Sequence, residues 1–98
     1  MHLNEELTDI LRGRTIALVT KEEGLVTILF HDRSKLQIKT VGGFSENMLG
    51  EGRIEGVEEA EATLTLFGEQ DRSAILTLAS PGSSITVTAK DGQVEYSG

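Results

Sequence analysis

One pattern runs twice along this chain and limits how the chain can fold. Residues 13–41 read GRTIALVTKEEGLVTILFHDRSKLQIKTV, and residues 52–80 read GRIEGVEEAEATLTLFGEQDRSAILTLAS. Each begins with Gly-Arg and passes through an acidic stretch to an apolar run that contains Thr and ends in Phe. Asp-Arg-Ser and a second apolar run follow. Such self-similarity predicts an architecture built from two similar units.

In both units, apolar and polar residues alternate with the period of two that is typical of half-buried β-strands. Polar turn residues separate the runs, so each unit is predicted to be a three-stranded antiparallel meander. We interpret the acidic run at 58–61 as a turn, and we expect Ile16 and Leu18 to share one face. The other residues predicted to face inward are Val26, Ile28, Phe30, Leu36, Ile38, Leu64, Leu66, Leu76 and Leu78.

The two units can be aligned in two ways. Matching the letters places Phe30 on Phe67, but a shift of one residue sends every strand side chain to the opposite face, and this alignment inverts the buried face. Keeping the faces places Phe30 on Leu66 and leaves Phe67 outside the core. A true internal duplication and two independent meanders with similar turns are both open at this point.

The two ends of the chain add a helix and a hairpin. Residues 4–12 have apolar residues at helical spacing, with Asn4 suited to the N-cap and Gly13 suited to the C-terminal end. Residues 84–97 alternate around Asp91-Gly92, which is a sequence typical of a two-residue hairpin turn. The apolar stripe of the predicted helix consists of Leu3, Leu7, Ile10 and Leu11.

These elements predict a single domain over residues 1–98 that is mainly β. We expect a small antiparallel barrel or roll of about eight strands, with the short helix packed on one opening. The alternative is a two-sheet sandwich, because both architectures protect the edges of their strands.

The composition argues against several classes of function. There is no Cys, so a disulfide or a thiolate metal site is impossible. The formal net charge of −7 disfavours nucleic acids and anionic membranes. No apolar run approaches the roughly 18 residues of a membrane span. We expect a cytoplasmic protein with no cofactor and no membrane or nucleic-acid partner.

His31-Asp32-Arg33 is the place where a base, an acid and a cation are adjacent in sequence, which is the raw material of acid–base catalysis. Neighbouring residues of a strand point to opposite faces, however, and Asp and Ser are common turn residues. We therefore interpret Asp32 to Ser34 as a hairpin turn and assign no catalytic residue. No metal site is predicted either, because His2 and His31 lack a partner at ligand spacing.

Between the two units lies the segment GGFSENMLGEG, residues 42–52, which lacks the Lys-Ser/Thr of a phosphate-binding loop. Its apolar residues are unusual for a connector. We name Phe44, Met48 and Leu49 as a candidate surface for a ligand or a partner. The alternative is that these side chains plug one end of the barrel.

The C-terminal segment resembles the ending of a group of short, uncharacterised bacterial proteins. Residues 79–98 read ASPGSSITVTAKDGQVEYSG, and the shared elements are Pro-Gly-Ser-Ser, Lys-Asp-Gly, Val-Glu-Tyr and a final Gly. The resemblance covers about a fifth of the chain and implies no activity, because the group itself has no assigned activity.

Three functions are compatible with the sequence. The first is a non-catalytic interaction or structural protein that acts as a homo-oligomer, because Leu29, Phe44, Met48 and Phe67 exceed what one small core needs. The second is a small-molecule-binding barrel with residues 42–52 as its lid. The third is an enzyme that uses His31 and Asp32.

Overall fold

The computed structural model describes residues 2–3, 5–41, 45–46, 52–69, 73–80 and 82–98. Within them lie one helix and ten strands, and two of the strands have only two residues. Every strand pair is antiparallel. The predicted fold class is confirmed, because the structure is mainly β with about eight substantial strands and one short N-terminal helix.

The elements follow one another along the chain with short connections. In order they are β1 (His2–Leu3), α1 (Glu5–Leu11), β2 (Thr15–Glu22), β3 (Leu25–Phe30), β4 (Lys35–Lys39), β5 (Ser45–Glu46), β6 (Gly52–Ala60), β7 (Thr63–Gly68), β8 (Ser73–Thr77), β9 (Ile85–Thr88) and β10 (Val94–Ser97).

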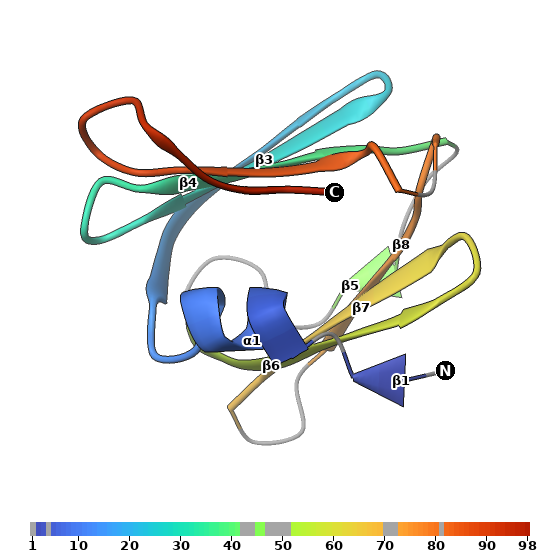
Figure 1. The fold of residues 1–98 in the computed structure, drawn as a ribbon, viewed down its shortest axis with the longest axis horizontal. Coiled ribbons are helices and arrows are strands. Elements are labelled where there is room, and N and C mark those ends of the chain that lie inside the picture. Colours follow the sequence, from blue (N-terminus) through green and yellow to red (C-terminus); the bar gives the residue numbers. More distant parts are fainter. Residues whose placement is uncertain (1, 4, 42–44, 47–51, 70–72, 81) are drawn as a thin grey trace.

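The strands form one path in the order β10-β9-β4-β3-β2-β6-β7-β8-β5, with β1 beside β6. In the described residues β2 and β6 pair at only two positions, one of them Thr15 with Arg53. The path turns over at this joint into two layers (Figure 1). We call β10-β9-β4-β3-β2 the first sheet and β6-β7-β8-β5 the second sheet. A bridge between Thr40 and Leu78 links the ends of β4 and β8. The architecture is therefore a roll rather than a closed barrel.

The two meanders share one pattern of strand pairing. Each residue of the first meander corresponds to the residue 38 positions later in the second meander. Under this offset, every residue pair between β2 and β3 matches a pair between β6 and β7, and every pair between β3 and β4 matches a pair between β7 and β8. For example, the pair Val26–Ile38 becomes the pair Leu64–Leu76. The hairpin lengths and turn positions therefore coincide residue by residue.

Both joints between the meanders obey the same relation. Thr15 pairs with Arg53 and Thr40 pairs with Leu78, and each of these pairs joins a residue to its own equivalent. Two backbone hydrogen bonds beside the second joint, Val41 N–H to Thr77 O at 3.1 Å and Ala79 N–H to Lys39 O at 2.9 Å, are also equivalent to each other. An approximate two-fold axis thus passes through both joints.

This offset corrects both predicted alignments of the two units. It places Phe30 on Gly68, the last residue of β7, and it places Leu29 on Phe67. The alignment by identical residues is wrong because Gly-Arg and Asp-Arg-Ser lie near turns, where sequence identity says little about strand register. The buried faces of the strands determine the pairing instead.

Two further expectations are corrected at bulges and turns. The register of β2 shifts between Ile16 and Leu18, so these residues point to opposite faces. Most of the acidic run is strand rather than turn, because β6 continues through Glu58 and Glu59 to Ala60. The turn consists of Glu61 and Ala62, and Glu61 adopts a positive φ of 54°.

One apolar core fills the space between the layers. Phe30 is 3% exposed at the end of the inward row of β3, as predicted, whereas Phe67 is half-buried. The buried apolar residues are Leu7, Leu11, Ile16, Val26, Ile28, Phe30, Leu36, Ile38, Ile54, Val57, Leu64, Leu66, Ala74, Leu76, Leu78, Ile85 and Val87.

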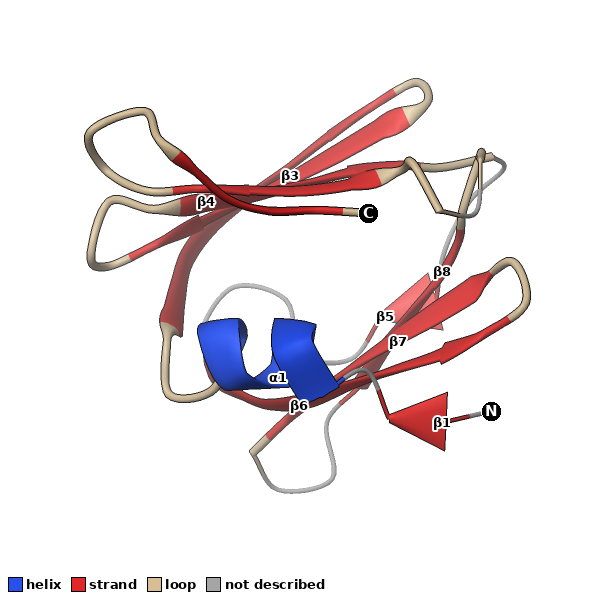
Figure 2. Ribbon diagram, in the orientation of Figure 1, coloured by secondary structure: helices blue, strands red, loops and turns tan. Residues whose placement is uncertain are grey.

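The helix α1 connects the two layers (Figure 2). It contacts β6 of the second sheet and β10 of the first sheet, and it buries Leu7 and Leu11 completely. The Thr8 hydroxyl donates to the Val57 carbonyl at 3.2 Å and accepts from the Val57 N–H at 3.0 Å. A seven-residue helix does not persist alone, so these contacts hold it in place.

We predict that Phe30→Ala lowers the free energy of unfolding by about 3–5 kcal/mol, because it leaves a cavity in the core. Phe67→Ala should lower it clearly less, since the Phe67 side chain is only partly buried. Urea denaturation followed by circular dichroism measures both losses. Equal losses would contradict the placement of Phe67 on the outer side of β7.

A second prediction concerns the attachment of the helix. Thr8→Val keeps the shape of the side chain but leaves the N–H and the carbonyl of Val57 without their partner. We expect a loss of about 1–3 kcal/mol in the free energy of unfolding. Thr20→Val, on an exposed position of β2, is the matched control and should change stability little. A neutral Thr8→Val variant would show that this contact does not stabilise the helix.

Candidate interaction surface

The predicted hairpin turn at Asp32 is present. Asp32 Oδ1 accepts hydrogen bonds from the Ser34 N–H at 2.9 Å and from the Ser34 hydroxyl. Arg33 adopts a positive φ of 73°, and its N–H donates to the Phe30 carbonyl at 3.0 Å. His31 is exposed. Asp32 is thus held by its own turn, and no contact joins it to the His31 side chain among the interactions of the described residues.

The electrostatics of this turn follow from the same contacts. The hydrogen bond from the Ser34 side chain is the main reason that the pKa of Asp32 lies below its ordinary value, and Arg14, at 3.8 Å, also lowers it. Arg14 lies between two carboxylates, because its Nη2 also contacts Glu95 Oε2 at 2.6 Å. These contacts tie the beginning of β2 to the β3–β4 turn and to β10, which favours a structural role.

The other candidate residues give no site that can be described. Phe44, Met48 and Leu49 lie outside the described residues. Across the described part of the chain, no three His, Asp or Glu side chains gather closely enough to hold a metal ion.

The one helix of the described residues, α1, is too short and too polar to cross a bilayer.

The outer side of the first sheet, which we call the first face, is organised in cross-strand rows. Its side chains point away from the core, and directly paired residues stand side by side. The first row crosses all five strands, and so does the second. The rows are Leu18–Leu29–Lys35–Thr88–Val94, Thr20–Thr27–Gln37–Thr86–Ser97 and Glu22–Leu25–Lys39.

The first row is apolar at both ends. Leu18 is 53% exposed on β2, Val94 is 61% exposed on β10, and Leu29 is half-buried beside Leu18. Lys35 continues the row with a long aliphatic stem, and such stems cover apolar surface while the charge stays in water. Single exposed apolar residues are ordinary, but a row with two exposed apolar residues and the half-buried Leu29 across one sheet suits a contact with another surface.

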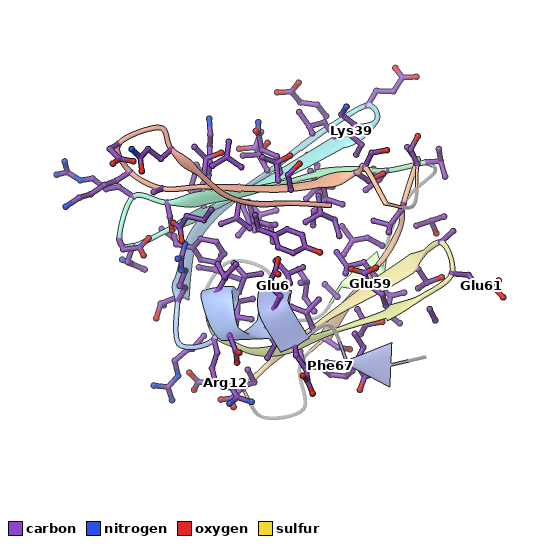
Figure 3. All side chains as sticks on the ribbon, in the orientation of Figure 1. Glu6, Arg12, Lys39, Glu59, Glu61 and Phe67 are labelled. Carbon is purple, nitrogen blue, oxygen red and sulfur yellow. The ribbon has the colours of Figure 1, made fainter. Side chains whose placement is uncertain are left out.

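The outer side of the second sheet, the second face, is smaller and lies on the opposite side of the molecule. Figure 3 places Lys39 on the outer side of the first sheet and Phe67 on the outer side of the second. Ile75 is 45% exposed, and Thr65, beside it, is buried. The rows of the second face are Gly56–Phe67–Ser73, Glu58–Thr65–Ile75 and Ala60–Thr63–Thr77.

The two halves differ sharply in charge although they share one pairing pattern. Residues 14–41 contain five basic and three acidic side chains, whereas residues 52–79, an equal length, contain two basic and six acidic ones. At equivalent positions, Thr20 is replaced by Glu58 and Lys21 by Glu59. The first face therefore belongs to a basic half and the second face to an acidic half.

Comparison of the chain with models of protein families, with curated proteins and with solved structures finds no match.

Sequence reasoning identified part of this surface. The sequence predicts Leu29 and Phe67 as apolar residues beyond the needs of the core, and the structure puts them at equivalent positions on the two outer faces. The sequence pattern does not identify Leu18 as a surface residue, because an uninterrupted alternation places its side chain inside the core. The bulge at Ala17 turns it outward, and nothing in the sequence marks that bulge.

The turn geometry predicts a pH effect. Because the pKa of Asp32 is lowered in the folded protein, ionised Asp32 stabilises the fold above the unfolded pKa of about 3.9, and this contribution is lost as the pH falls through the lower folded pKa. Ser34→Ala should therefore raise the pKa of Asp32 toward its ordinary value. NMR titration of the carboxyl carbon measures it, with the exposed Ser83→Ala as control. An unchanged pKa would refute the role of the Ser34 hydroxyl.

Proposed function

We propose that this protein has a non-catalytic role and acts as a homo-oligomer, using the outer side of its first sheet as a contact surface. The observation that carries the proposal is the row Leu18–Leu29–Lys35–Thr88–Val94, which presents exposed apolar side chains at both ends of a five-stranded face. Burial of such side chains against a partner is favourable in proportion to the apolar area removed from water.

The composition of the first face supports a protein partner. Its second row consists of uncharged polar side chains, and its charged residues are Lys35, Lys39 and Glu22. Protein interfaces are depleted of charge at their centre and carry polar groups at the rim. A sheet face with few charges in a chain of net charge −7 fits that pattern.

The catalytic alternative has less support. Asp32 accepts two hydrogen bonds from Ser34 and lies near Arg14, so its carboxylate already has partners in the turn. A general base needs a free lone pair directed at a substrate proton and a matched pKa, whereas the pKa of Asp32 is lowered.

We also propose that the two meanders arose by internal duplication. Support comes from the constant offset of 38 residues, which covers both hairpins of each meander, the bulge of each first strand and the two joints. Two independent meanders have no reason to share a bulge at one position, because bulges are local features of individual strands.

The test of the proposed function is the mass of the protein in solution. Light scattering over micromolar to millimolar concentration should give a mass above the 10.6 kDa of one chain. Val94→Asp should weaken the association about tenfold or more, because it places a charge at one apolar end of the row. Val41→Asp is the matched control, since Val41 is 51% exposed but belongs to neither set of rows. A mass of one chain throughout would refute the proposal.

A further inference from the structure

We infer that the self-association is head-to-tail, with the first face of one copy docked on the second face of the next copy. This inference rests on the proposed function and adds the identity of the partner surface. Heterologous contacts use two different patches of one chain, whereas two-fold contacts use one patch twice. The choice between these two modes is decided by charge.

A two-fold contact of the first face with itself brings lysines together. β4 is the central strand of the first sheet, and it carries Lys35 and Lys39 on either side of Gln37. A two-fold axis that runs along β4 stacks each lysine on its own copy. An axis across β4 stacks Lys35 on Lys39. Like charges placed opposite each other in an interface are strongly unfavourable, so the first face is poorly suited to bind itself.

The second face combines apolar side chains with acidic ones, which suits it to the lysines and leucines of the first face. Phe67 on β7 and Ile75 on β8 lie in neighbouring rows, with Phe67 opposite Ser73 and Ile75 opposite Thr65. Glu58 on β6 is opposite Thr65, in the same row as Ile75. The exposed Glu55 and Glu61 add negative charge at the bulge of β6 and at its hairpin tip. Leucines of the first face can therefore meet aromatic and aliphatic side chains while its lysines meet carboxylates.

A two-fold contact of the second face with itself is disfavoured by repulsion between acidic side chains. It would bring Glu58 and the acidic residues around it against their own copies, within the half of the chain that carries six acids and two bases. Pairing the basic half with the acidic half relieves both repulsions. Opposite potentials on two patches of one molecule favour a contact between those patches.

The position of the two faces sets the form of the assembly. They lie on opposite sides of the roll, as Lys39 and Phe67 show in Figure 3. Each copy can therefore bind two neighbours, and repetition gives a ring if the rotation closes and an open chain if it does not. Masses larger than that of a dimer are expected as the concentration rises.

Charge reversals on the two faces test the inference. Lys39→Glu on the first face and Glu58→Lys on the second face should each weaken association about tenfold or more. The matched controls are Lys90→Glu and Glu23→Lys, which make the same charge changes at exposed turn positions and should leave association unchanged. Circular dichroism checks that each variant is folded, and Ile75→Lys replaces Glu58→Lys if that variant unfolds.

Mixing the two variants distinguishes the modes of contact. The Lys39→Glu chain keeps an intact second face, and the Glu58→Lys chain keeps an intact first face. A mixture of equal amounts should therefore form complexes of at least two chains at concentrations where each variant alone is monomeric. Association of the unmodified protein should also weaken as salt rises from about 0.05 to 0.5 M.

The outcomes separate this inference from the proposed function. An unmodified protein that stays monomeric overturns both. If the unmodified protein assembles but Glu58→Lys associates as strongly as its control Glu23→Lys, the head-to-tail contact is overturned and self-association stands. The same conclusion follows if the mixture of the two variants does not associate.

Discussion

The whole structure depends on burying one side of each meander against the other with little backbone pairing between them. The named joints are the short β2–β6 pairing at Thr15 and Arg53 and the Thr40–Leu78 bridge. Backbone hydrogen bonds flank both joints, and between the joints the described residues hold the layers together by side-chain packing, to which α1 contributes by contacting both layers. Apolar burial is the dominant favourable term in folding, so the inner faces set the register that the strands adopt.

This constraint acts unequally on the two sides of the strands. Most inner positions that are equivalent under the offset of 38 are apolar in both halves, as in Val26 and Leu64 or Ile38 and Leu76, although Phe30 corresponds to Gly68. Several outer equivalents differ in kind: Gln37 corresponds to Ile75 and Lys39 to Thr77. Packing fixes the inner residues, since a core responds to the change of a single methylene. The outer residues are free of that demand, so the difference between the halves is where function can reside.

Much of the fold could be predicted from the sequence because period-two alternation reports which side of a strand is buried. The inward row that ends at Phe30 and the turn at Asp32 followed from that alternation and from turn chemistry. The full length of β6 did not, because the acidic run before Glu61 reads as a loop by composition. A strand tolerates a Glu residue wherever the Glu side chain reaches water. The pairing with β7 shows that Glu58 and Glu59 belong to a strand.

The surface was harder to predict than the core, because a surface row is created by register rather than by neighbouring letters. Leu18 and Val94 are separated by most of the chain, and they stand in one row only because four successive strand pairings place them there. A shift of one residue in any of these pairings would remove the row. The same pairings that bury the core therefore also assemble the face, and a roll with two related meanders necessarily presents two such faces on opposite sides. Once their charges differ in sign, as they do here, the molecule carries both halves of a contact with its own copies.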